Sequence, residues 1–97
     1  MSEQHQSYYV VMYDIQDPKR LRRIAKILKS HGIRVQKSVF ECKLAASEVE
    51  AVKTKVTGVI CDSDSVRLYP LNQQCLLTRV VLGEALYDEQ PPGILVV

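Results

Sequence analysis

The sequence has no long hydrophobic segment. Its apolar runs are only a few residues long, whereas a helix needs roughly 20 apolar residues to cross a bilayer. The N-terminal residues MSEQHQS are polar and lack the apolar core of a signal peptide. We therefore expect a cytoplasmic protein that does not associate with a membrane.

The three cysteines lack the spacing of a metal site. Cys42, Cys61 and Cys75 are odd in number, and no Cys-x-x-Cys or His-x-x-x-His pattern occurs, so we expect no zinc site and a reduced protein. No glycine-rich phosphate loop and no aromatic RNA-recognition motif is present. Ser38 has no evident histidine partner, which argues against a nucleophilic triad.

Acidic residues are nearly absent from one part of the chain. Glu41 is the only acid between Lys19 and Lys43, although the net charge of the chain is only +2. That span holds nine of the 13 basic residues: Lys19, Arg20, Arg22, Arg23, Lys26, Lys29, Arg34, Lys37 and Lys43. This asymmetry indicates an anionic partner better than the net charge does.

The length of 97 residues fits a single domain over residues 1–97, with residues 1–7 expected to be mobile. Tyr8–Ile15 is almost continuously apolar, which predicts a central strand covered on both faces. Asp17 then suits the N-cap of a helix that ends near Gly32. Its buried stripe is expected at Leu21, Ile24, Ala25 and Leu28.

The remaining segments predict a second helix and further strands. Ile33–Leu44 is expected as one long strand, and Ser47 with Glu50 has the pattern of a capping box. The inner face of that helix would carry Val49, Val52 and Val56. A turn-rich stretch, in which Asp62 and Asp64 serve the turn, follows. Further strands are expected at Val66–Leu71, where Pro70 implies a sheet edge or a bulge, at Leu76–Gly83 and at 94–97.

These elements predict an α+β fold, with an antiparallel sheet covered by two helices on one face. Counted literally, the order is β-α-β-α-β-β plus a terminal strand, whereas a ferredoxin-like fold is β-α-β-β-α-β. The uncovered sheet face and the apolar tail ILVV favour a homodimer in which the tail pairs with the partner's sheet. The alternative is that the tail pairs within its own sheet.

Asp14 stands out because it ends an apolar strand. One interpretation is a cap for the following helix, although Asp17 holds the better position for that. The other is a metal ligand or general base. A two-fold dimer would bring a second Asp14 near the first, and the two carboxylates could hold one cation.

The basic residues allow two interpretations, phosphate binding or plain solvation. Arg22, Lys26 and Lys29 share the outer face of the first helix, Arg20 and Arg23 flank its apolar stripe, and Arg34 and Lys37 follow on the next strand. By alternation, Gln36, Ser38 and Phe40 share a strand face. Phe40 is expected in the core or in a dimer contact, with base stacking as the alternative.

Several stretches together resemble one known family. YYVVMYDI, KRLRRIAKILKSHG, RVQKSVFECKL, SVRLYPL and GILVV are similar to the Cas-two family of CRISPR-associated proteins over roughly Tyr8 to Val97. The resemblance implies a ferredoxin-like βαββαβ homodimer whose terminal strands pair across the subunits. It also implies an Asp14 from each subunit facing its counterpart, with Tyr13, Arg34, Ser38 and Phe40 nearby.

The resemblance implies antiviral defence by spacer acquisition, with nucleic acid and the CRISPR integrase as partners. One hypothesis is a Mg²⁺-dependent endonuclease, with Mn²⁺ as an alternative ion, that cleaves single-stranded RNA or double-stranded DNA at Asp14. A second is a non-catalytic scaffold that holds DNA through Arg20, Arg22, Arg23, Lys26, Lys29 and Lys37. A toxin-like RNA nuclease is a third.

Overall fold

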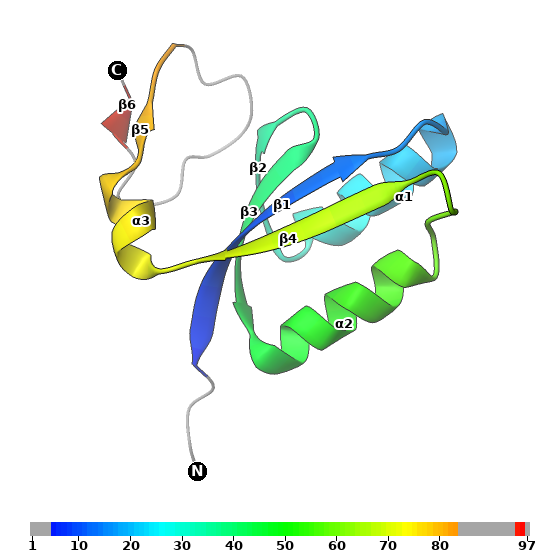
Figure 1. The fold of residues 1–97 in the computed structure, drawn as a ribbon, viewed down its shortest axis with the longest axis horizontal. Helices are drawn as coiled ribbons and strands as arrows, with labels where there is room; N and C mark the ends of the chain where they lie inside the picture. Colours follow the sequence, from blue (N-terminus) through cyan, green and yellow to red (C-terminus); the bar gives the residue numbers. More distant parts are fainter. Residues whose placement is uncertain (1–4, 84–94, 97) are drawn as a thin grey trace.

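The structure is a computed structural model and describes residues 5–83 and 95–96. Its main sheet has four antiparallel strands in the order β2-β3-β1-β4 (Figure 1). These are β1 (Gln6–Asp14), β2 (Gly32–Gln36), β3 (Val39–Ala45) and β4 (Ser65–Leu71). The central position predicted for the first strand and the edge position predicted for the strand with Pro70 are both confirmed. β1 begins at Gln6, within the N-terminal segment 1–7 that the sequence predicts to be mobile.

Helix α1 (Pro18–Lys29) begins as its sequence predicts. The Asp17 carboxylate accepts a hydrogen bond from the Arg20 backbone N–H at 2.9 Å, and Pro18 holds the first helical position. Ile24 and Leu28 are buried, with Leu21 and Ala25 packed against the same core. The predicted role of Gly32 is wrong: the helix ends at Lys29 with Ser30 as its C-cap, and Gly32 opens β2.

The single strand predicted for Ile33–Leu44 is wrong, because this segment is a hairpin of β2 and β3 that reverses at Lys37 and Ser38. No glycine, proline or asparagine marks the reversal, so local turn signals do not reveal it. Phe40, Cys42 and Leu44 share the buried face as alternation predicts. Gln36 ends β2 and Ser38 lies in the reversal itself, so neither continues the buried face of β3, which corrects their assignment to it.

Helix α2 (Ala46–Thr57) starts one residue before the predicted capping serine. Its N-cap is Ala45, and Glu48 at the third position accepts a hydrogen bond from the Ala45 backbone N–H at 2.9 Å. The capping role of Ser47 is therefore wrong. Val52 and Val56 are buried and Val49 packs beside them, as predicted.

The strand predicted over Leu76–Gly83 is only partly confirmed: its first three residues belong to a short helix, α3 (Gln73–Thr78), and only Val80–Val81 is a strand. The Asn72 side chain accepts a hydrogen bond from the Cys75 backbone N–H at 2.8 Å, which caps this helix locally. Two short strands, β5 (Val80–Val81) and β6 (Leu95–Val96), pair in parallel within the chain. Pairing of the terminal strand across two copies stays a prediction, and residues 94 and 97 lie outside the described part.

The two long helices pack side by side against one face of the sheet (Figure 1). The core between the helices and the sheet contains Val11, Tyr13, Ile24, Leu28, Phe40, Cys42, Leu44, Val52 and Val56. The predicted α+β, ferredoxin-like fold is confirmed, with the order βαββαβ in its first six elements. The described residues cover only one face of β1, because Met12 on its other face is 44% exposed, so the predicted cover on both faces is not seen among them. No helix among the described residues is long and apolar enough to cross a membrane.

Candidate active site at the end of the central strand

Asp14 is the last residue of β1 and is exposed. It lies opposite Ser65 of β4 in the strand register. The two residues border a pocket of about 280 Å³ that is lined by Met12, Tyr13, Asp14, Ser65, Arg67 and Tyr69. Because successive side chains on a strand point to opposite faces, Asp14 shares the open sheet face with Met12.

The helix-capping interpretation of Asp14 is not supported. The carboxylate that caps α1 belongs to Asp17. Among the described residues, the Asp14 side chain makes no hydrogen bond or ion pair. An exposed carboxylate without a partner has its oxygens available for a cation or for a water molecule.

Tyr13, Arg34 and Phe40 form a brace on the opposite, helix-covered face. The Arg34 guanidinium lies 5.5 Å from the centroid of the Phe40 ring and donates a hydrogen bond to the Tyr13 hydroxyl at 3.3 Å. That hydroxyl donates to the Lys37 carbonyl at 3.2 Å. The three residues therefore tie the end of β1 to the β2–β3 hairpin, and the Arg34 and Phe40 side chains do not line the Asp14 pocket.

Ser38 lies close to the site through its main chain. Its carbonyl accepts a hydrogen bond from the Tyr13 backbone N–H at 3.1 Å. This contact fixes the strand immediately before Asp14.

Most of the predicted phosphate-binding residues are exposed. Arg22, Arg23, Lys26 and Lys29 lie on α1 and Lys37 lies in the β2–β3 turn, all with exposed side chains. None of them forms an ion pair with a described residue. The outer face of α1 is thus a positive surface on the helix side of the sheet, away from the face that carries Asp14.

Arg20 differs from the other basic residues because it is held by an acid. Its Nε and Nη2 donate to the two carboxylate oxygens of Asp64, at 2.7 and 3.3 Å. This contact lowers the pKa of Asp64 and raises that of Arg20. Asp64 also accepts a hydrogen bond from the Cys61 backbone N–H at 2.9 Å, so its predicted role in the turn is confirmed.

Within the described part of the chain, no group of three or more His, Cys, Asp or Glu residues could hold a metal ion. One chain therefore supplies Asp14 as the single carboxylate of the pocket. Burial raises the pKa of Cys42 to about 11, which keeps this thiol protonated at neutral pH.

Arg67 and Tyr69 line the pocket but were missed in the sequence analysis. They are two residues apart on β4, and Arg67 Nη1 donates to the Tyr69 hydroxyl at 3.4 Å. In the sequence, Arg67 and Tyr69 alternate with the apolar Val66 and Leu68, and this pattern could have indicated that both polar side chains share one face of the strand. Their place beside Asp14 depends on the long-range register of β1 and β4, which the sequence does not show.

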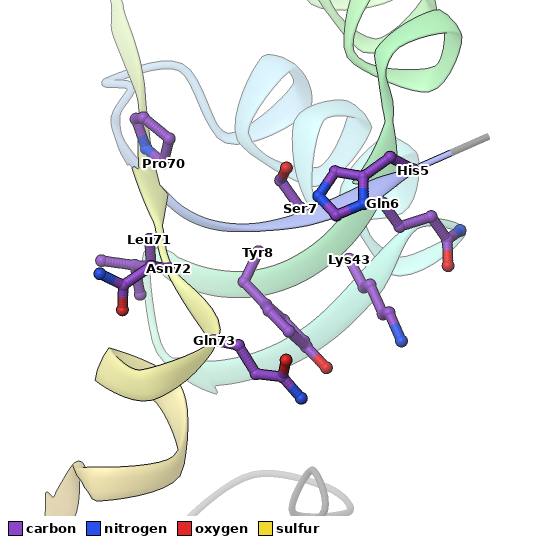
Figure 2. A pocket seen from close by; sticks show the side chains of 9 residues that line it. All are labelled: His5, Gln6, Ser7, Tyr8, Lys43, Pro70, Leu71, Asn72 and Gln73. Carbon is purple, nitrogen blue, oxygen red and sulfur yellow. The ribbon is translucent and has the colours of Figure 1, made fainter.

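A second pocket, of about 480 Å³, lies at the other end of β1 (Figure 2). Tyr8, Lys43 and Gln73 are among its lining residues, and Lys43 Nζ lies 5.4 Å from the centroid of the Tyr8 ring. Its described lining residues include none of those predicted for the site and no carboxylate.

The fold is ferredoxin-like, with a four-stranded antiparallel sheet and two helices on one face. It carries a carboxylate site, because Asp14 at the end of the central strand has no side-chain partner among the described residues. Residues 7–79 match the family model described as CRISPR associated protein Cas2, and the chain belongs to this family.

Individual relatives agree with this assignment. The chain is 37% identical over 90 residues to "CRISPR-associated endoribonuclease Cas2 3" of Synechocystis, covering 92% of this chain and 97% of that protein. Streptococcus pyogenes Cas2, solved at pH 6.5, is 38% identical with a TM-score of 0.66, covering 70% and 89% of the two chains. A chain of a structure described as a partial Cas6-RT-Cas1--Cas2 complex is 26% identical with a TM-score of 0.66, covering 75% and 81%.

Proposed function

We propose that this protein is a metal-dependent endonuclease of CRISPR spacer acquisition that works as a homodimer in the cytoplasm and cleaves RNA or DNA at Asp14. The observation that carries the proposal is the exposed, unpaired Asp14 carboxylate at the rim of a pocket that also contains Arg67. A carboxylate next to a guanidinium suits a phosphodiester, which needs an activated water and compensation of its negative charge. The name of the Synechocystis relative supports the same activity.

The open sheet face supports the homodimer. Met12 and Tyr69 lie on this face with 44% of their surface exposed, although they stand on the middle and edge strands of the sheet. A second copy placed over this face would cover both side chains. The same arrangement would bring together an Asp14 from each chain.

The donor chemistry of Asp14 fits Mg²⁺ or Mn²⁺, which favour carboxylate oxygens and keep several waters. One carboxylate is a minimal ligand set, so the Asp14 residues of both copies would hold the ion. When bound, such an ion supplies a Lewis acid and a water of lowered pKa. The chain itself contributes the rigid strand end, which Ser38 and Tyr13 hold in place.

A second function, a DNA-holding scaffold for a Cas1-type integrase, is favoured by a separate observation. The exposed basic face of α1 carries Arg22, Lys26 and Lys29 without ion pairs to described residues, and it can contact phosphates whether or not Asp14 is catalytic. The structural relative in a complex with Cas1 supports this partner.

The test is cleavage of labelled single-stranded RNA and duplex DNA by wild type, Asp14→Ala and the control Asp62→Ala, with Mg²⁺, Mn²⁺ or EDTA. We expect the wild type and Asp62→Ala to cleave only with metal, and Asp14→Ala to be inactive while still binding the duplex. Wild-type protein that cleaves neither substrate, alone or with the integrase, would refute the nuclease and leave the scaffold.

A further inference from the structure

Arg67 shares the pocket with Asp14 but is offset from it along the sheet. In the register of the two strands, Asp14 lies opposite Ser65 and Met12 lies opposite Arg67. Asp14 and Arg67 are therefore diagonal neighbours on the open face. Such pairs have their Cα atoms about 7–8 Å apart, within reach of a long side chain.

The two charged groups do not neutralise each other, because no ion pair joins them. Arg20 and Arg79, by contrast, are held by the carboxylates of Asp64 and Glu41. Within the described part of the chain, the contact that holds the Arg67 guanidinium is the neutral Tyr69 hydroxyl, at 3.4 Å. Most of its five N–H donors remain available for an anion.

We propose that Arg67 binds a non-bridging oxygen of the phosphate that is positioned at Asp14, and that Tyr69 orients the guanidinium through its hydroxyl. The inference rests on the proposed function for the reaction, while its phosphate-binding part is testable without cleavage. The ligand of the pocket is then one phosphate of a nucleic acid. This phosphate is distinct from those that would bind along the outer face of α1.

The chemistry of hydrolysis explains why a guanidinium suits this position. The oxygen of water forms a bond to phosphorus and the ester P–O bond breaks. The hydroxyl stays on phosphorus, and the released proton ends on the leaving oxygen. Negative charge on the phosphate oxygens must be balanced throughout, and Arg67 can meet two oxygens with its planar fork while keeping its own protons. An arginine side chain stays charged at every working pH, and the hydrogen bond with Tyr69 raises the pKa of Arg67 further.

The first arm of the test measures cleavage kinetics of Arg67→Ala, Arg67→Lys and Tyr69→Phe. We expect Arg67→Ala to lower kcat about 100-fold or more, as for other lost donors to a charged transition state. Arg67→Lys should recover part of that loss. Tyr69→Phe should lower kcat by about tenfold, the effect of one hydrogen bond to a charged group, with an unchanged melting temperature.

The second arm measures binding of single-stranded RNA and duplex DNA in the Asp14→Ala background, so that no cleavage interferes. Adding Arg67→Ala should reduce the slope of log Kd against log salt concentration by about 0.9 for duplex DNA, the value for one phosphate contact. Adding Lys55→Ala, which removes one exposed charge from α2 on the opposite side of the sheet, should leave that slope unchanged. Gel filtration of each variant checks that the oligomeric state is retained, and Arg67→Gln replaces Arg67→Ala if it is not.

The two arms separate this inference from the proposed function. If Asp14→Ala abolishes cleavage while Arg67→Ala alters neither kcat nor the salt slope, the role of Arg67 is refuted and the nuclease stands. If wild type never cleaves but Arg67→Ala still lowers the slope, the nuclease is refuted and the phosphate site stands. Equal loss of slope in the Arg67→Ala and Lys55→Ala variants would also refute the inference, because it would reflect net charge alone.

Discussion

At the scale of single residues, Tyr13 and Asp14 are neighbours in the chain with opposite environments. Tyr13 is 5% exposed and its hydroxyl bonds the β2–β3 turn on the helix-covered face, whereas Asp14 is exposed on the open face. The alternation of a strand separates them. A substitution at Tyr13, Arg34 or Phe40 therefore acts on Asp14 through the backbone that holds it.

Gly32 offers a test at this scale. A Cβ there would lie 2.4 Å from the Glu41 carbonyl oxygen and 2.5 Å from Cys42 Sγ. Gly32→Ala should therefore destabilise the fold by about 1–3 kcal/mol, the usual cost of overpacking. The matched control is Gly58→Ala, whose Cβ would meet its nearest atom at an ordinary 3.5 Å and which should be stabilising by about 0.4–1 kcal/mol. Urea unfolding measures both, and equal effects would contradict the close approach.

At the scale of elements, α1 has two faces with separate roles. Its inner face supplies Ile24 and Leu28 to the core, and its outer face presents Arg22, Lys26 and Lys29. Arg20 belongs to neither group, because Asp64 ties it to the loop before β4. The basic cluster seen in the sequence thus divides into one structural arginine and a set of exposed cations.

The outer face of α1 can be tested by its salt dependence. Lys26→Ala/Lys29→Ala should reduce the slope of log Kd against log salt for duplex DNA by up to about 1.8, or 0.9 for each lost phosphate contact. Lys53→Ala/Lys55→Ala removes the same number of lysines from α2 and should leave the slope nearly unchanged. A larger effect from the α2 pair would move the binding surface to that helix.

The Arg20–Asp64 contact predicts a specific acid sensitivity. Because the folded protein holds the pKa of Asp64 below its unfolded value of about 3.9, the stabilisation is complete above that value. It is lost as the pH falls through the lower, folded pKa. The difference in unfolding free energy between wild type and Asp64→Asn should therefore be largest near neutral pH and shrink in acid.

Denaturant titrations across a pH series measure this difference. Asp62→Asn removes the same charge from the same turn without touching the ion pair and is the control. The contact would be unimportant if the stability of Asp64→Asn equalled that of wild type at neutral pH.

At the scale of the whole molecule, the sheet is a layer with helices on one side and exposed apolar side chains on the other. Met12 and Tyr69 are 44% exposed on that open side. Exposed apolar surface on a sheet face is typical of a protein interface. The Asp14 pocket opens on this same face, so assembly and the site are coupled in the proposed homodimer.

Met12→Glu tests this coupling. A charge at the centre of the open face should convert the homodimer to a monomer and abolish cleavage, since the two Asp14 residues would separate. Ala51→Glu places the same charge on the exposed surface of α2 and should preserve both properties. Sedimentation velocity gives the oligomeric state, and a Met12→Glu protein that remains dimeric would place the interface elsewhere.

The sequence by itself determined the class of fold, the central strand, the helix cap at Asp17 and the inner stripe of both long helices. Those features depend on local pattern: apolar spacing, a capping side chain and a proline at the first turn. It also singled out Asp14, because a carboxylate at the end of an apolar strand is conspicuous. The resemblance to the family supplied the βαββαβ order that literal counting missed.

Three features became apparent only in the folded structure: the hairpin that reverses at Lys37–Ser38, the helix at Gln73–Thr78 and the surroundings of Asp14. The register of β1 on β4 places Arg67 and Tyr69 in the pocket, and the Asp64 contact removes Arg20 from the exposed basic set. The strand register, which sets Asp14 opposite Ser65, and the Arg20–Asp64 contact join residues far apart in the sequence, and such pairing has no local signature. The residues that surround Asp14 follow from which strands pair and in what register.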